Sequence, residues 1–227
     1  MPRCASILMH AFLTALVVAG SAAIAAESIE QRVQSLESVI GGYPPHIDGE
    51  NQKRAILQRY DEAKSELDAD LLEHPGDIRL LLLRGQLQSM GHNMDIPGAW
   101  DGAAADYKAI LKSKPDDVEA ILSLAELWVN SNPALAPNAE NLFRGAQCYL
   151  GKTPNERAQR GIFFALYYQG KIQAAARQAS YLVRQWPDVE EYKRLASIAN
   201  AVIARSGKNA KNGDERRPTI AMADCNQ

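Results

Sequence analysis

The sequence predicts an all-α protein built from stacked helical hairpins. Apolar residues recur at helical spacing along most of the chain, and one spaced pattern repeats. In this pattern a small residue precedes an apolar one by four places, and a proline follows eight places after the apolar residue. The pattern occurs at Ala63, Leu67 and Pro75, at Ala103, Tyr107 and Pro115, and at Ala175, Ala179 and Pro187. Such a repeat is typical of helical hairpins that bury their apolar faces against neighbouring hairpins.

Length and charge indicate the size of the domain and argue against one class of partner. The chain has 227 residues, of which 46% are hydrophobic, and this is enough for one sizeable domain. Its formal net charge of −2 provides no clustered basic face. We therefore expect no nucleic-acid partner.

Residues 1–26 have the pattern of a secretory signal peptide. Arg3 precedes an apolar run over residues 7–19, and Ala23 and Ala25 form an A-x-A processing site. The alternative is an uncleaved anchor, which we disfavour because a membrane span needs about 20 apolar residues. We expect a cleaved signal and a periplasmic protein that meets a membrane only through a partner complex.

Two cysteines remain after processing at this site, Cys148 in an apolar helical stretch and Cys225 in a polar tail. An oxidising compartment permits a disulfide between them. The alternative is a buried thiol and a separate terminal thiol. We favour the second, because sequence spacing alone does not establish disulfide geometry.

The domain organisation follows from breaks in the helical pattern. Residues 27–50 are expected to form a short helix and a linker rich in glycine and proline, because Gly41-Gly42 and Pro44-Pro45 interrupt the periodicity. Residues 51–205 form the predicted repeat domain, with a capping helix at its end, and residues 206–227 a disordered polar tail. The helices of the domain are predicted over residues 51–73, 77–90, 99–112, 116–129, 139–150, 153–169, 171–185 and 189–204.

Short motifs indicate the helix ends. Asp116-Asp117 provides an N-terminus with favourable charge, and Thr153-Pro154 is read as an N-cap followed by proline in the first turn. Residues 130–137 contain two prolines and are expected to be extended. In the helix over residues 51–73 we expect Ala55 on the buried face, together with Ile56, Tyr60, Ala63, Leu67 and Leu71.

These residues resemble the tetratricopeptide repeat (TPR) family, whose unit is about 34 residues of helix–turn–helix. In the second helix of each unit, the family's spaced positions are matched by Ala63, Leu67, Asp70 and Pro75; by Ala103, Tyr107, Ile110 and Pro115; by Ala139, Phe143, Ala146 and Gly151; and by Ala175, Ala179, Leu182 and Pro187. Departures include Asp70 and Gly151, and Arg84 at a usual leucine position. The resemblance implies a right-handed α-solenoid of roughly three repeats. The alternative is an ordinary helical bundle.

The resemblance also implies a groove lined by the first helix of each hairpin. Placed by this register, the groove residues are Arg79, Leu82, Gln86, Glu119, Leu122, Glu126, Arg157, Arg160, Phe164 and Tyr167. We expect an amphipathic helix or an extended apolar segment to dock there, with Arg157 and Arg160 facing acidic residues of the partner. The alternative is that Leu82, Leu122 and Phe164 simply pack against capping elements.

Nothing in the sequence indicates catalysis, a cofactor or a small-molecule substrate. No histidine pair has the spacing of a metal site, and His92 with Asp95 provides only two candidate ligands. Cys148 has no local base partner, and there is no nucleophile elbow. We therefore expect a protein that is not an enzyme and holds no metal.

The function predicted from these observations is a periplasmic scaffold or adaptor that binds a peptide or protein segment. One alternative, carried by the resemblance, is a TPR-type factor of cytochrome c maturation that binds apocytochrome. Another is an auxiliary structural subunit of an envelope or secretion complex.

Overall fold

The computed structural model describes residues 27–206, and within that range it contains α-helices, loops and one 3₁₀ turn but no strand. This confirms the all-α prediction. The predicted signal peptide and the tail from residue 207 onward lie outside the described residues. The helices are α1 (Ile29–Ile40), α2 (Gly49–Glu73), α3 (Ile78–Asn93), α4 (Ala99–Ser113), α5 (Val118–Ser131), α6 (Ala136–Leu150), α7 (Glu156–Tyr168), α8 (Ile172–Gln185) and α9 (Glu190–Ser206).

Helix boundaries in the first half of the chain follow local signals. Asp77 is the N-cap of α3, and its carboxylate accepts hydrogen bonds from the backbone amides of Arg79 and Leu80 at 2.8 and 3.1 Å. Asp117 caps α5 in the same way through the Ala120 amide. Each carboxylate satisfies amides that a helix leaves unpaired at its first turn.

The structure corrects three details of the predicted elements. Residues 130–137 are not extended, because α5 continues to Ser131 and a 3₁₀ turn (Pro133–Leu135) leads directly into α6. The N-cap of α7 is Asn155 rather than Thr153, because the Asn155 side chain reaches the Ala158 amide at 2.9 Å. Ala55 is exposed, since the buried stripe of α2 runs through residues one place further along.

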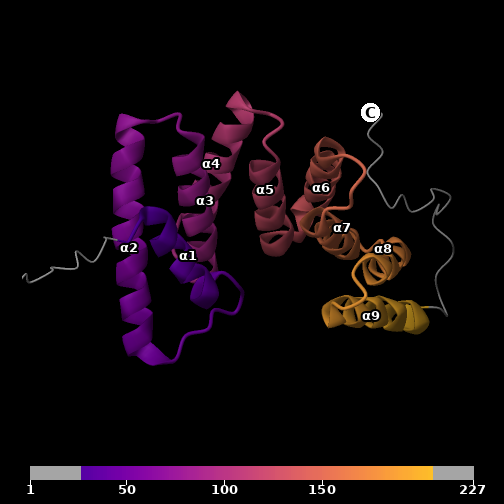
Figure 1. Ribbon diagram of the computed structural model, residues 1–227. Helices are drawn as coiled ribbons and strands as arrows, with labels where there is room; N and C mark the ends of the chain where they lie inside the picture. The colour runs from indigo at the N-terminus through magenta and orange to yellow at the C-terminus, as the bar shows by residue number, and fades with distance from the viewer. Residues whose placement is uncertain (1–26, 207–227) are drawn as a thin grey trace, which may run out of the picture.

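Consecutive helices pack side by side, as Figure 1 shows from α2 to α9. The loops between them are short, so packed neighbours run antiparallel. Three pairs of alternate helices also meet: α1 contacts α3, α3 contacts α5, and α5 contacts α7. Helices α1, α3, α5 and α7 therefore share one side of the stack. Helix α1 belongs to this arrangement, because it packs on both α2 and α3.

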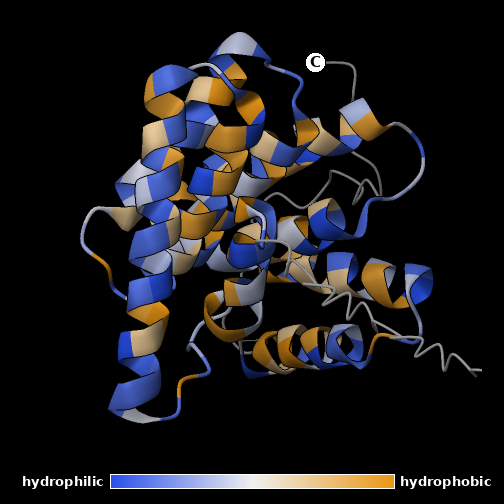
Figure 2. Cartoon of the chain, turned by 60° about the vertical axis from the view of Figure 1, so that its left-hand side comes forward, coloured by the Kyte–Doolittle hydropathy of each residue, from blue (hydrophilic) through white to orange (hydrophobic). Residues whose placement is uncertain are grey.

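The core consists of two hydrophobic clusters that meet at α5. The N-terminal cluster joins α1 to α4 and takes Leu124 and Leu127 from α5, whereas the C-terminal cluster joins α6 to α9 and takes Ile121 and Ala125. Figure 2 shows hydrophobic and hydrophilic residues alternating along the helices, as expected where one face of each helix is buried. The small residues of the repeated pattern are all fully buried: Ala63, Ala103, Ala139 and Ala175.

Two glycines allow large rings to approach a neighbouring helix closely. A Cβ atom on Gly85 of α3 would lie 2.6 Å from the ring of Tyr107 on α4. A Cβ atom on Gly161 of α7 would lie 2.3 Å from the ring of Phe143 on α6. Both rings are fully buried, so the absence of a side chain is required for this packing.

Arg84, which departs from the apolar residue usual at its position in the resembled repeat, is held by a network of polar groups. Its Nε and one terminal nitrogen donate to the two oxygens of Asp106 at 2.9 and 2.6 Å, and its other terminal nitrogen donates to Asp68 at 2.8 Å. Gln88 Nε2 also donates to Asp106, at 2.9 Å. Asp106 is only 3% exposed, so three donors compensate for the burial of its carboxylate.

A second polar network links α6, α7 and α8. Gln159 Nε2 donates to Gln147 Oε1 at 3.0 Å, and Gln178 Nε2 donates to Gln159 Oε1 at 2.8 Å. All three glutamines are buried. Gln147 Oε1 also accepts from the Asn155 amide at 2.9 Å, which fixes the loop before α7.

Cys148 on α6 is disulfide-bonded. The expectation of a free thiol at this position is therefore wrong. The other two cysteines of the chain, Cys4 and Cys225, both lie outside the described residues. Sequence spacing could not decide between the two states, because the approach of a second cysteine depends on tertiary structure.

Candidate binding groove

The odd-numbered helices line a groove with a volume of about 1230 Å³. Side chains from α1, α3, α5 and α7 form most of its wall, and Tyr107 of α4, Phe143 of α6 and Glu191 of α9 complete it. The loops after α1 and α3 contribute Tyr43 and Asp95. A single surface thus collects side chains from residue 30 to residue 191, most of them from the shared side of α1, α3, α5 and α7.

Six of the ten groove residues predicted from the sequence line this hollow. They are Gln86 on α3, Glu119 and Glu126 on α5, and Arg157, Arg160 and Phe164 on α7. These six residues of α3, α5 and α7 therefore lie around one hollow.

The other four predicted residues do not line it. Arg79 forms an ion pair with Glu30 at the surface, and Leu82 packs against the N-terminal cluster. Leu122 is only 2% exposed inside the C-terminal cluster, and Tyr167 packs against that same cluster. Leu122 is buried because α5 has helices on several sides, so little of its surface is left for the groove.

Arg157 is the centre of an ion cluster in the groove wall. One terminal nitrogen donates to both oxygens of Glu119 at 2.8 and 2.9 Å, while Nε and the other terminal nitrogen donate to Glu126 at 3.1 and 2.7 Å. Arg160 lies 3.9 Å from Glu126. Burial alone would lower the pKa of the Arg157 guanidinium, but Glu126 and Glu119 outweigh burial and raise it. Arg157 thus links α5 to α7 and is engaged within the chain.

Aromatic rings follow one another along α7. Phe164 stacks on Tyr168 with ring centroids 6.3 Å apart, and Phe163 stacks on Tyr167 at 5.9 Å. Phe163 is buried, whereas Phe164 and Tyr168 line the groove and Tyr168 is 44% exposed. The pair Phe164 and Tyr168 therefore offers an apolar contact surface beside the ion cluster.

The floor of the groove contains hydroxyl groups that the sequence did not indicate. Tyr107 belongs to α4, but the space left by Gly85 lets its ring pass α3 and reach the groove. Its hydroxyl lies 3.1 Å from Ser89 Oγ, and Ser123 also lines the groove. Burial raises the pKa of Tyr107, so this phenol is neutral and serves as a hydrogen-bonding group. The position of Tyr107 in the groove depends on the close approach of its ring to Gly85, which the sequence does not show.

His92 and Asp95 both line the groove, near the loop that follows α3. Among residues 27–206, no group of three or more histidines, cysteines or carboxylates is arranged to hold a metal ion. Over the same range, every helix is too short or too polar to cross a bilayer.

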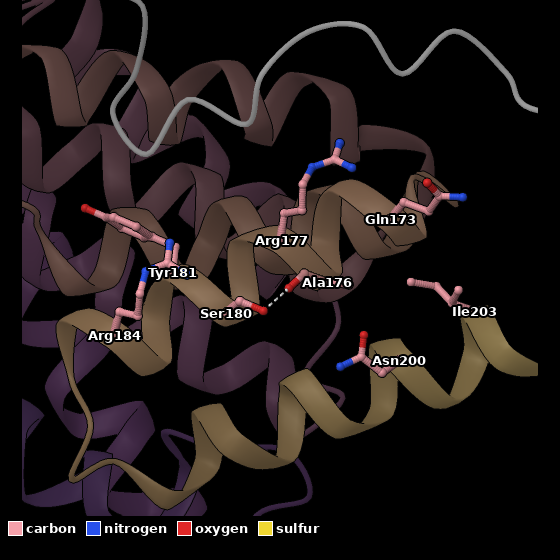
Figure 3. A pocket seen from close by; sticks show the side chains of 8 residues that line it. All are labelled: Gln173, Ala176, Arg177, Ser180, Tyr181, Arg184, Asn200 and Ile203. Carbon is pink, nitrogen blue, oxygen red and sulfur yellow. Dashed lines mark hydrogen bonds between the residues drawn. The ribbon is translucent and has the colours of Figure 1, made fainter.

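A smaller hollow of about 660 Å³ lies between α8 and α9 (Figure 3). Figure 3 shows Asn200 and Ile203 of α9 facing the side chains of α8 across it. Arg184 lies over the ring of Tyr181, 5.9 Å from its centroid, and Ser180 Oγ donates to the Ala176 carbonyl of its own helix at 3.0 Å. This hollow involves one pair of helices, whereas residues of seven helices line the groove.

Comparison with known proteins identifies no family. No protein-family model matches the sequence, and neither the curated proteins nor the solved structures give a significant match.

Proposed function

We propose that this protein is a non-catalytic scaffold that binds a peptide or protein segment in the groove of its odd-numbered helices. The observation that carries the proposal is the groove itself, to which seven helices contribute side chains. Its volume of about 1230 Å³ exceeds the roughly 300–1,000 Å³ of most small-molecule pockets. An open hollow of this kind, with apolar rings beside charged groups, suits an extended or helical segment.

The helix pairs are best described, within this proposal, as TPR-like repeats of a right-handed solenoid. Two observations support this description. The small residues of the repeated pattern are fully buried where each second helix meets its neighbours, and the first helices of successive pairs contact one another. A solenoid of this type leaves a concave surface along the first helices, which is the surface that the groove occupies.

The periplasm is the compartment that we propose for this scaffold. The disulfide of Cys148 supports it, because disulfides persist in oxidising compartments and are rare in the cytosol.

Site-specific photo-crosslinking in the native host tests the proposal. A photoreactive amino acid is placed at Gln86, Asn130 or Tyr168 in the groove, and at Leu72 or Tyr149 as controls. Both controls are exposed hydrophobic positions away from the groove, with 85% and 58% of their surface accessible. We expect the three groove positions, and not the controls, to form one common adduct.

Adducts that form only at Leu72 or Tyr149, or at no position, would contradict the proposal. Mass spectrometry of a groove adduct then tests the alternative of an apocytochrome partner directly. Size-exclusion chromatography of native extracts tests the alternative of a permanent structural subunit, which predicts that all of the protein elutes in a large complex.

A further inference from the structure

The charged residues of the groove are mainly acidic. Two guanidinium groups, Arg157 and Arg160, line it, whereas the carboxylates number six: Glu30, Glu37, Asp95, Glu119, Glu126 and Glu191. The groove thus differs in charge from the chain as a whole, whose basic and acidic residues nearly balance. Its electrostatic potential favours cations.

The two arginines neutralise Glu119 and Glu126 and are not free to pair with an incoming ligand. Arg157 makes four hydrogen bonds to Glu119 and Glu126, and Arg160 lies 3.9 Å from Glu126. The expectation that these arginines face acidic residues of a partner therefore conflicts with their contacts inside the chain. A partner carboxylate would have to displace Glu119 or Glu126 from a geometry that already satisfies Arg157.

Three carboxylates in the groove remain available. Glu37 on α1, Asp95 in the loop after α3 and Glu191 on α9 are exposed, and none forms an ion pair with another described residue. Glu37 and Glu191 lie on α1 and α9, the first and last of the described helices, which Figure 1 shows apart from one another. The apolar pair Phe164 and Tyr168 lies on α7, between α1 and α9 in chain order.

We infer that the occupant of the groove is a cationic amphipathic segment of a partner protein, an inference that rests on the proposed function. Its apolar face contacts Phe164 and Tyr168, and its lysine or arginine side chains contact Glu37, Asp95 and Glu191. Long cationic side chains suit these positions because their stems cover apolar surface while their charged ends reach the carboxylates. The charge of the groove selects the partner and increases the rate of encounter.

Selection from a displayed library of random 16-residue segments against the purified protein tests this inference. We expect the enriched segments to be net positive, with apolar residues at helical spacing. Their affinity should fall when the salt concentration rises from about 50 to 500 mM, because salt screens exposed charges. Enrichment of neutral or acidic segments that depend on Phe164 would overturn the charge inference and leave the groove function standing. Enrichment of no segment would overturn the proposed function itself.

Two triple variants test whether the three available carboxylates of the groove cause the binding of cationic segments. The first, Glu37→Gln, Asp95→Asn and Glu191→Gln, removes the three available groove charges, and asparagine tolerates the positive φ of residue 95. The matched control, Glu73→Gln, Asp101→Asn and Asp116→Asn, removes three exposed carboxylates that do not line the groove. Both sets include one residue in the first turn of a helix, Glu191 of α9 and Asp101 of α4.

Exposed ion pairs contribute about 1.5- to 5-fold each, so the groove variant should bind an enriched segment at least about 3-fold more weakly. The control variant should bind within about 2-fold of the unmodified protein, since its charges lie away from the groove. Equal loss in the two variants would show an effect of net charge alone and would overturn the inference.

Discussion

Replacing Asp106 tests how much the buried ion network between α3 and α4 contributes to the stability of the folded protein. The Asp106 carboxylate is 3% exposed and accepts three hydrogen bonds, two from Arg84 and one from Gln88. Asp106→Ala removes both acceptor oxygens and so all three hydrogen bonds at once. Arg84 then retains only its bond to Asp68, and the amide of Gln88 loses its partner.

The size of the effect follows from the burial of the groups that remain. Removing one partner of a buried ion pair costs about 3–5 kcal/mol, because the other charge stays uncompensated. The Arg84 side chain is 24% exposed, so water relieves part of this penalty and we expect about 3 kcal/mol. For a domain of this size, that loss lowers the melting temperature by roughly 6–12 °C.

Urea unfolding followed by circular dichroism at the helix band measures this free energy. Asp68→Ala is the matched control, because Asp68 bonds the same arginine but is 39% exposed, and it should cost less than about 1 kcal/mol. The combined variant Arg84→Met with Asp106→Leu should recover most of the lost stability, since apolar residues can replace a buried pair. If Asp106→Ala costs no more than Asp68→Ala, the network does not have the role that we assign to it.

Three further predictions concern packing, pH and the disulfide. Gly161→Ala should destabilise the protein by about 1–3 kcal/mol, because its new methyl group meets the Phe143 ring. Gly145→Ala is the control and should be neutral or stabilising, because its methyl group meets nothing within 4 Å. Equal changes in the free energy of unfolding, measured in urea, would refute this prediction. Although burial raises the pKa of Glu140, hydrogen bonds and nearby cations hold this pKa below its ordinary value. The ionised carboxylate therefore stabilises the folded protein above about pH 4.5, and this stabilisation is lost as the pH falls further. The melting temperature should therefore fall less steeply below about pH 4.5 in Glu140→Gln than in the unmodified protein, and parallel curves would contradict the assignment. Peptide mapping without reduction should find Cys148 in a cross-linked peptide, and full alkylation of its thiol before reduction would disprove the disulfide.

The helices could be predicted from the sequence because their ends are encoded locally. Asp77 and Asp117 cap helices within a few residues of a proline, and these signals depend on no distant contact. The N-cap of α7 was predicted at the wrong residue for the opposite reason. Asn155 is held by Gln147, eight residues earlier on α6, and this contact exists only once the helices have packed.

The groove could be predicted only in part. A helical register indicates which side chains share one face, and this was sufficient for Glu119, Glu126 and Arg157. It does not indicate how far neighbouring helices cover that face, so Leu122 was assigned to the groove although the C-terminal cluster buries it. The hydroxyl of Tyr107 was missed because it reaches the groove from α4 through the space beside Gly85.

We propose that the odd-numbered helices form the binding face of this protein. Titration of an isotope-labelled sample with an enriched cationic segment, followed by amide chemical shifts, tests it most directly. The largest changes should occur at groove residues of α3, α5 and α7, such as Gln86, Ser123 and Phe164. Changes concentrated instead at Arg184 and Asn200, in the hollow between α8 and α9, would contradict it.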